Sequence, residues 1–176
     1  MSLGASELVV KRVTAYSPRV AAGLGRLMPI LDEGFSGDPM PRKALEEIIE
    51  SPSHDQLVAE HRGQIVGSGV MTLILGSGFW RDKPEGQQQN RQGHLEDFVV
   101  DPSMRGVRDP GTGKSAADLI WDGMQDFCRD HDAPALVFDS ETWRPDAWKF
   151  YAKHGAGPLP DTRHFEVPVP DVGANI

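Results

Sequence analysis

Short apolar or alternating runs mark the strands of this chain, and the last of them is typical of an edge strand. Phe165, Val167 and Val169 alternate with polar or small neighbours, and Pro168 confines this strand to an edge. Two earlier runs flank residues 61–64, His-Arg-Gly-Gln, which have the composition of a hairpin turn, so we expect those two strands to be antiparallel. The expected strands are residues 8–13, 57–59, 65–75, 94–100, 135–138 and 165–169.

Apolar residues recur three or four positions apart in four other segments, which predicts helices. The clearest pattern covers residues 116–128, and we expect its apolar face to cover the sheet. The segment from Pro18 to Leu31 has a similar stripe but contains Gly23, Gly25 and Pro29, which predict a short or broken helix. The expected helices are residues 18–31, 41–49, 116–128 and 145–151, the last of them capped by Gly155.

No internal repeat or linker divides the chain, which has 176 residues and 39% hydrophobic content. This is enough to build one core, so we expect a single domain over residues 6–170, with flexible termini at 1–5 and 171–176. Residues 76–93 are polar and include three consecutive glutamines. They lack an apolar period, which predicts a long mobile loop.

Charge and cysteine content narrow the classes of function. The chain has 18 basic and 26 acidic residues, a formal charge of -8, which argues against nucleic acid or an anionic membrane as partner. Cys128 is the one cysteine, so no intrachain disulfide can form, and the six histidines lack metal-ligand spacing. The sequence has neither a membrane-spanning apolar run nor a secretion-signal pattern, and we expect a cytoplasmic protein without a metal.

A glycine-rich loop, Arg105 to Ser115, lies between the strand at 94–100 and the helix at 116–128. Its glycines allow backbone N–H groups to approach a ligand, and the helix that follows directs its unpaired amides and positive dipole end to the same point. Arg105, Arg108 and Lys114 add positive charge in an acidic protein. The loop therefore predicts a site for a phosphate or pyrophosphate. For such a loop taken alone, a solvated turn without a ligand is the alternative.

The run Val100 to Gly106, followed by Gly111-Thr112-Gly113, resembles the coenzyme A loop of the GNAT superfamily. Arg108 to Gly113 matches the family signature Arg/Gln-x-x-Gly-x-Gly/Ala, although Val107 to Pro110 intervene where family members pass directly from Arg-Gly to the glycine pair. The order of the expected elements agrees over most of the chain. The resemblance implies acetyl-CoA as cosubstrate and an α/β (α+β) fold. Its mixed, mostly antiparallel central sheet would have six to seven strands, flanked by about four helices.

The resemblance also implies where the cosubstrate binds. The pantetheine would lie in a gap between the fourth and fifth strands, where backbone groups would hold it like an added strand. The pyrophosphate would lie against the glycine-rich loop. The cofactor-binding residues implied are Phe98, Val99, Val100, Arg105, Gly106, Arg108, Gly111, Thr112, Gly113, Lys114 and Ser115.

The same loop offers a competing motif. Gly113-Lys114-Ser115 ends like a Walker A loop, and Leu136 to Asp139 imitates a Walker B strand. However, Arg108 occupies the position of the first Walker A glycine. Too little chain follows Lys114 to build the parallel sheet of a nucleotide kinase, so we disfavour this interpretation.

Two adjacent carboxylates, Glu96 and Asp97, lie on the fourth expected strand. Their side chains point to opposite faces unless a bulge intervenes. Either could take the proton of an amine or hold a cationic substrate, and the alternative for each is a solvent-facing carboxylate. Residues 94–100 look most like the corresponding strand of glucosamine-6-phosphate N-acetyltransferases. The long loop at 76–93 does not fit that subgroup, so its substrate is not carried over.

Ala147 to Gly155 is similar to a family helix with the pattern Ala-x-x-hydrophobic-Tyr-x-Lys-x-Gly. By this match Tyr151 would donate a hydrogen bond or proton to the coenzyme A sulfur; a core tyrosine is the alternative. We expect an acetyl-CoA-dependent N-acetyltransferase that acetylates a primary amine of a small molecule by direct transfer in a ternary complex. A non-catalytic acyl-CoA-binding sensor is the alternative function. The family also suggests a homodimer.

Overall fold

The computed structural model describes residues 8–76, 91–140 and 145–157, to which the structural statements below apply. The chain divides into two units, Met1–Asp139 and Ser140–Ile176, and each is described by itself. The elements in chain order are β1 (Leu8–Arg12), α1 (Pro18–Leu31), α2 (Arg42–Glu50), β2 (His54–His61), β3 (Gln64–Leu75), β4 (Arg91–Val100), the 3-10 helix η1 (Pro102–Met104), α3 (Ala116–Asp130), β5 (Leu136–Val137) and α4 (Pro145–Lys153).

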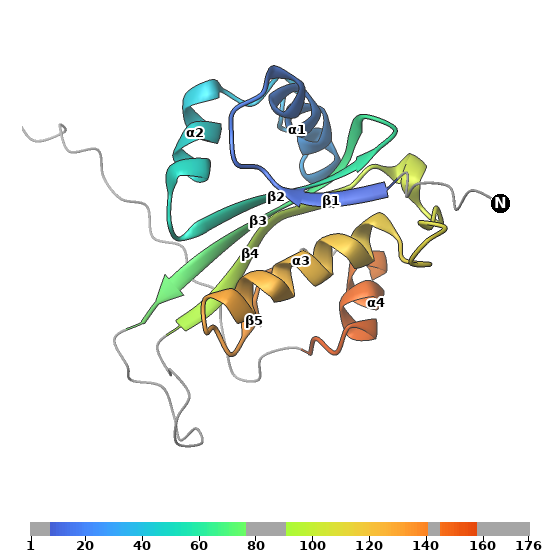
Figure 1. Cartoon of the computed structure of the whole chain (residues 1–176). Helices are drawn as coiled ribbons and strands as arrows, with labels where there is room; N and C mark the ends of the chain where they lie inside the picture. Colours follow the sequence, from blue (N-terminus) through green and yellow to red (C-terminus); the bar gives the residue numbers. More distant parts are fainter. Residues whose placement is uncertain (1–7, 77–90, 141–144, 158–176) are drawn as a thin grey trace, which may run out of the picture. The chain divides into compact units, whose positions relative to one another are not determined.

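One mixed sheet forms the centre of the first unit, with the strand order β1-β2-β3-β4-β5. Strands β1 to β4 pair antiparallel in succession, and β5 pairs parallel with β4. Helices α1 and α2 cover one face of the sheet and α3 covers the other (Figure 1). The α+β architecture and the four α-helices agree with the expectation. The described residues form five strands instead of six to seven, and the strand expected at 165–169 lies outside them.

The hairpin predicted from residues 61–64 is confirmed, because β2 and β3 pair antiparallel. Its turn has Arg62 at φ 49° and Gly63 at φ 79°. Two consecutive left-handed residues are the backbone of a two-residue type I′ turn, whose twist matches that of the flanking strands. The local sequence therefore sets the register of this hairpin.

The expected interruption of α1 is wrong, because α1 is one continuous helix of 14 residues. Pro29 lies in its last turn, where the missing N–H removes one hydrogen bond without dividing the helix. The two glycines allow close packing. A Cβ at Gly23 would lie 2.5 Å from the Cβ of Ile65, and one at Gly25 would lie 1.8 Å from the carbonyl oxygen of Asp38. Tertiary contact, which a local pattern does not reveal, explains these glycines.

The fourth strand begins at Arg91, earlier than the expected His94. Residues 91–93 were expected to be loop, but they pair with residues 73–75 of β3. The Arg91 guanidinium also donates a hydrogen bond of 2.9 Å to the carbonyl of His131 at the end of α3. The part of the expected loop from 77 to 90 lies outside the described residues.

The face of α3 that was expected to cover the sheet is buried. Its capping box is formed by Ser115 and Asp118, so the helix begins directly after the glycine-rich loop. The opposite face of the sheet carries a core cluster that includes Val20, Leu24 and Val99. The buried residues of α3 are Ala116, Asp118, Ile120, Trp121, Met124, Phe127 and Cys128.

Candidate functional site

The regular pairing of β4 breaks where the two candidate carboxylates lie. Three residues of β3, from Ser68 to Val70, face four residues of β4, from Glu96 to Val99. Asp97, inside this irregularity, has φ 52°. Two residues opposed by one, with a left-handed backbone, form a β-bulge. A left-handed backbone costs a residue with a Cβ up to about 1–2 kcal/mol, and aspartate is one of the residues that tolerate it best, so Asp97 suits this position of the bulge better than most residues would.

The bulge changes which face of the sheet each later side chain meets. Leu95 lies on the α3 side, near the space above Gly69 that Met124 also approaches. Val99, four residues later, belongs to the core cluster on the α1 side. On a regular strand these two residues would share a face, because side chains alternate with a period of two. The simple expectation that Glu96 and Asp97 point to opposite faces therefore does not apply.

The two carboxylates differ in their surroundings. The Glu96 side chain is 52% exposed, and its Oε1 lies 3.4 Å from Nδ1 of His94. The pKa of Asp97 is raised, mainly because neighbouring atoms desolvate its carboxyl and secondly because Glu96 places a negative charge beside it. A carboxyl with a raised pKa accepts a proton more readily than an ordinary aspartate. The bulge thus brings together a carboxylate beside an imidazole and a carboxyl whose pKa is raised.

The pairing between β4 and β5 covers Gly93 and His94 alone. From Leu95 to Val100, β4 pairs with β3 and no longer with β5. An extended ligand could add to this edge as a further strand does. The predicted pantetheine contacts at 98–100 lie on this part of the strand.

A buried carboxylate organises the glycine-rich loop. Asp109 is 1% exposed, and its Oδ2 accepts hydrogen bonds from the amide and the hydroxyl of Thr112, at 2.8 and 2.9 Å. The Asp109 amide donates to the carbonyl of Lys114, and its carbonyl accepts from the amide of Gly113, both at 2.8 Å. Sequence reasoning missed this role. The signal was Asp-Pro-Gly-Thr, since an aspartate often bonds backbone amides a few residues later in a turn.

Basic side chains of the loop are also held in place. Arg108 donates to the carbonyl of Gly113 at 2.7 Å, and Lys114 pairs with Asp122 at 2.5 Å. Gly113 has φ 70°, a conformation that glycine adopts without strain. The loop is therefore a small closed structure whose charged ends remain exposed.

The loop leaves some amide donors available. The amides of Thr112 and Gly113 are used inside the loop, whereas Gly111 and Ala117 donate to no other described residue. The Ala117 amide belongs to the first turn of α3, where the helix dipole favours an anion. Hydrogen bonds hold the predicted residues from Arg108 to Ser115 together just before this helix end, whereas none of the described contacts joins Arg105 or Gly106 to it. Such an arrangement can bind a phosphate.

Tyr151 belongs to the second unit and lies on α4. Its ring packs edge-on against Phe150 with the centroids 5.9 Å apart, and its carbonyl accepts hydrogen bonds from the amides of His154 and Ala156. Gly155, at φ 81°, ends the helix as predicted. The role of the phenol remains a prediction.

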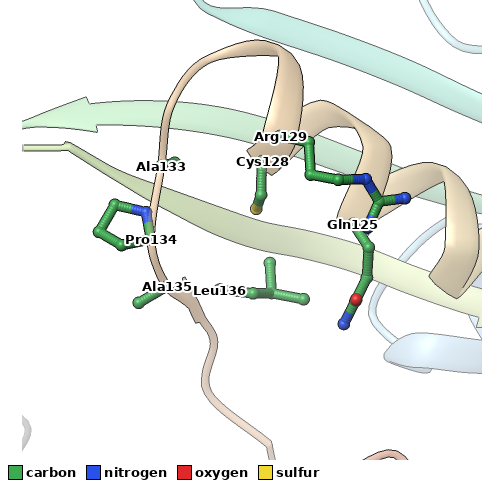
Figure 2. A pocket seen from close by; sticks show the side chains of 7 residues that line it. All are labelled: Gln125, Cys128, Arg129, Ala133, Pro134, Ala135 and Leu136. Carbon is green, nitrogen blue, oxygen red and sulfur yellow. The ribbon is translucent and has the colours of Figure 1, made fainter. Parts of the chain in front are cut away.

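One surface pocket of about 210 Å³ lies at the C-terminal end of α3, between that helix and the segment that leads into β5 (Figure 2). Cys128 points into the space beside Leu136, and burial raises the pKa of its thiol. Ala116, at the other end of α3, is about 18 Å away along the helix axis, so this pocket is not part of the loop site. Among the described residues, no group of side chains could hold a metal, and no helix is long and apolar enough to cross a membrane.

Comparisons with known proteins agree with this geometry. The family model described as "Acetyltransferase (GNAT) family" matches residues 25–156. The chain is similar to an acetyltransferase of Trypanosoma brucei, with 22% identity and a TM-score of 0.61 over 91% of this chain and 99% of that one. It is also similar to an aminoglycoside N-acetyltransferase in complex with CoA, with 15% identity and a TM-score of 0.69 over 96% and 100% of the two chains.

A third solved structure is an aminoglycoside acetyltransferase from an uncultured soil metagenomic sample, with 16% identity and a TM-score of 0.67 over 93% and 97% of the two chains. At these identities, the likenesses show a shared fold. No curated protein matches the chain.

Proposed function

The chain belongs to the acetyltransferase (GNAT) family, and from this premise we propose that it is an acetyl-CoA-dependent N-acetyltransferase for a primary amine of a small molecule. The observation that carries the proposal is the β-bulge, which places Glu96 and Asp97 where β4 stops pairing with β5. Transfer is direct, in a ternary complex. Cys128 is the one cysteine, and burial raises the pKa of its thiol, which disfavours it as a nucleophile.

The loop residues fit the diphosphate of coenzyme A. Gly111 and Ala117 offer amides, and the exposed side chains of Arg105, Arg108 and Lys114 offer positive charge. The edge of β4 from Leu95 to Val100 would hold the pantetheine through its backbone. Bound there, acetyl-CoA supplies an acetyl thioester, whose transfer to a neutral amine gives an amide and a free thiol.

The two carboxylates have different roles toward the acceptor amine. Asp97 is the base. Its pKa is raised toward the pKa of an ammonium group, so its carboxylate can accept a proton from the protonated amine, and the neutral amine can then attack the thioester. Glu96, whose side chain is 52% exposed, holds the cationic end of the acceptor by charge. The opposite assignment predicts the opposite mutant kinetics, so the two are separable.

Tyr151 is proposed as the acid that gives its phenolic proton to the departing sulfur. A phenol near its ordinary pKa of about 10 is protonated at neutral pH and can serve a thiolate in this way. Tyr151→Phe should lower kcat by about ten- to a hundredfold with the affinity for CoA unchanged, because the interaction develops with the charge on sulfur. Steady-state kinetics and calorimetry with CoA measure the two quantities, and full activity of the variant would remove Tyr151 from the mechanism.

The function itself is tested by acetyl-CoA consumption with a panel of polyamines, amino sugars, amino acids and aminoglycosides, the last because two similar structures carry that name. Turnover with one of them is expected. Asp97→Asn should then lower kcat, and Glu96→Gln should mainly raise the acceptor KM. Tight CoA binding without turnover on any amine would instead support a non-catalytic acyl-CoA sensor, since the fold does not guarantee chemistry.

A further inference from the structure

His94 lies two residues before Glu96 on β4, and the two side chains meet at the 3.4 Å distance between Nδ1 and Oε1. The register of β4 against β3 is regular from Arg91 to Glu96, and the bulge begins after it. Side chains two residues apart on a regular strand share a face. The backbone therefore places these two side chains next to each other on one face of the sheet, whichever rotamers they adopt.

The two partners differ in how firmly the sheet holds them. His94 pairs with Thr72 of β3 and with Val137 of β5, and it is the last residue of β4 with a strand on both sides. Its side chain is 26% exposed, against 52% for Glu96. The side chain of Glu96 is longer than that of His94 and has more rotatable bonds. Among the described residues, Glu96 has a neighbouring strand, β3, on one side alone. The histidine is thus the fixed partner and the glutamate the adjustable one.

The imidazole can hold the carboxylate in both of its charge states. The pair is a 3.4 Å contact, and a small rotation of either side chain would let an Nδ1–H donate a hydrogen bond to the carboxylate, to which an imidazolium would add a charge. His54 lies in the same row of the sheet, opposite Thr72, but its Nδ1 lies 2.7 Å from Oγ of Ser51. His54 therefore provides a matched imidazole that is engaged elsewhere.

We infer that His94 is a positioning residue, which fixes the Glu96 carboxylate in the orientation that receives the cationic end of the acceptor. The inference rests on the proposed function, which gives Glu96 that role. Without His94, Glu96 would spread over several rotamers and lose them on binding, at an entropic cost to acceptor affinity. The proton transfer and the binding of acetyl-CoA do not involve this pair.

Steady-state kinetics test the inference. His94→Leu should raise the acceptor KM about five- to tenfold while kcat and the KM for acetyl-CoA stay within about twofold. His94→Asn places an amide donor near the position of Nδ1 and should recover most of the loss. His54→Leu, the matched control, should leave the acceptor KM unchanged. A fall in kcat alone, or an equal loss in His94→Asn, would overturn the inference.

A double-mutant cycle separates positioning from general damage. In Glu96→Gln the charge that His94 orients is already gone, so adding His94→Leu should raise the acceptor KM by less than about twofold more. Additive losses would mean that His94 acts through the fold instead of through Glu96.

A readout that needs no acceptor is the conformation of the Glu96 side chain, followed by NMR of ¹³C-labelled glutamate. His94→Leu should increase the rotamer averaging of Glu96, because its fixed partner is gone, whereas His54→Leu should leave it unchanged. Equal averaging of Glu96 with and without His94 would overturn the inference even in an active enzyme. Increased averaging in His94→Leu together with no turnover on any amine would leave the positioning role intact and reject the proposed function instead.

Discussion

The glycine-rich loop from Arg105 to Ser115 and the end of β4 both leave regular structure, but they do so by different means. In the loop, the left-handed positions are Gly106 and Gly113, which adopt that backbone without strain. In β4, the left-handed position is Asp97, whose Cβ makes this backbone conformation less favourable than it is for glycine.

The two regions also differ in how their polar groups are satisfied. Asp109 is buried and accepts two hydrogen bonds from Thr112, so the loop is closed by its own contacts. The carboxyl of Asp97 is desolvated and lies beside a second negative charge, which is why its pKa is raised. The loop is therefore shaped for binding with little stored strain, whereas the bulge holds a residue in a state that suits proton transfer and costs stability.

The largest effect should come from breaking the closure of the loop. Asp109→Ala removes the buried acceptor for the amide and hydroxyl of Thr112, and a hydrogen bond to a charged group contributes about 1.5–3 kcal/mol. We expect the free energy of unfolding to fall by about 2 kcal/mol and the Kd for CoA to rise at least about tenfold. Chemical denaturation and calorimetry measure these values.

Asp122→Ala serves as the control for this prediction, because it removes an exposed partner of Lys114 from the same region. An exposed ion pair contributes about 0–1 kcal/mol, so CoA affinity should change by less than about fivefold. Equal effects of the two variants would show that charge near the loop matters and its closed shape does not.

A smaller effect should come from the backbone of the loop. Gly113→Ala forces a Cβ into φ 70° at a cost of about 1–2 kcal/mol, although the space around it is open. At Gly111 the added Cβ would lie 3.3 Å from Oδ2 of Asp109, and φ is outside the left-handed region. We expect Gly113→Ala to weaken CoA binding about five- to tenfold and Gly111→Ala less than about threefold. If Gly111→Ala proved the more damaging, contact of its amide with the ligand would outweigh backbone conformation.

Much of the fold and part of the site could be predicted from the sequence, because local patterns encode them. The hairpin turn, the amphipathic helix α3 and the glycine-rich loop each lie within a short stretch whose residue types set the backbone. The loop was recognised because glycines, basic residues and a helix start coincide within eleven positions, 105–115.

The remaining features depend on contacts between distant segments. The bulge at Asp97 is a property of how β4 pairs with β3, and no local pattern in His94 to Val100 shows it. The glycines of α1 are explained by Ile65 and Asp38, which lie so close that a Cβ would clash with them. The His94–Glu96 pair is different, because residues two positions apart on a strand share a face, but metal-ligand spacing among the histidines gives no sign of it.

The smallest effect should come from substitutions of Asp97 in β4, measured as a change in the free energy of unfolding. Asp97→Gly relieves a left-handed strain of at most about 1–2 kcal/mol but adds the backbone entropy of glycine, so this backbone contribution should raise the unfolding free energy by no more than about 1 kcal/mol. Asp97→Asn keeps a Cβ and removes the charge. Because the pKa of Asp97 is raised in the folded state, the ionised carboxyl opposes folding at neutral pH, and this penalty disappears as the pH falls through the raised pKa. Asp97→Asn should therefore be more stable than the wild type at pH 7 and no more stable near pH 3. Asp97→Gly removes the same carboxyl, so its advantage should also fall between pH 7 and pH 3, but only to the backbone contribution, since strain does not titrate. Chemical denaturation at the two pH values measures both differences, and a loss of stability in both variants at pH 7 would show that Asp97 supports the bulge instead of being held in it.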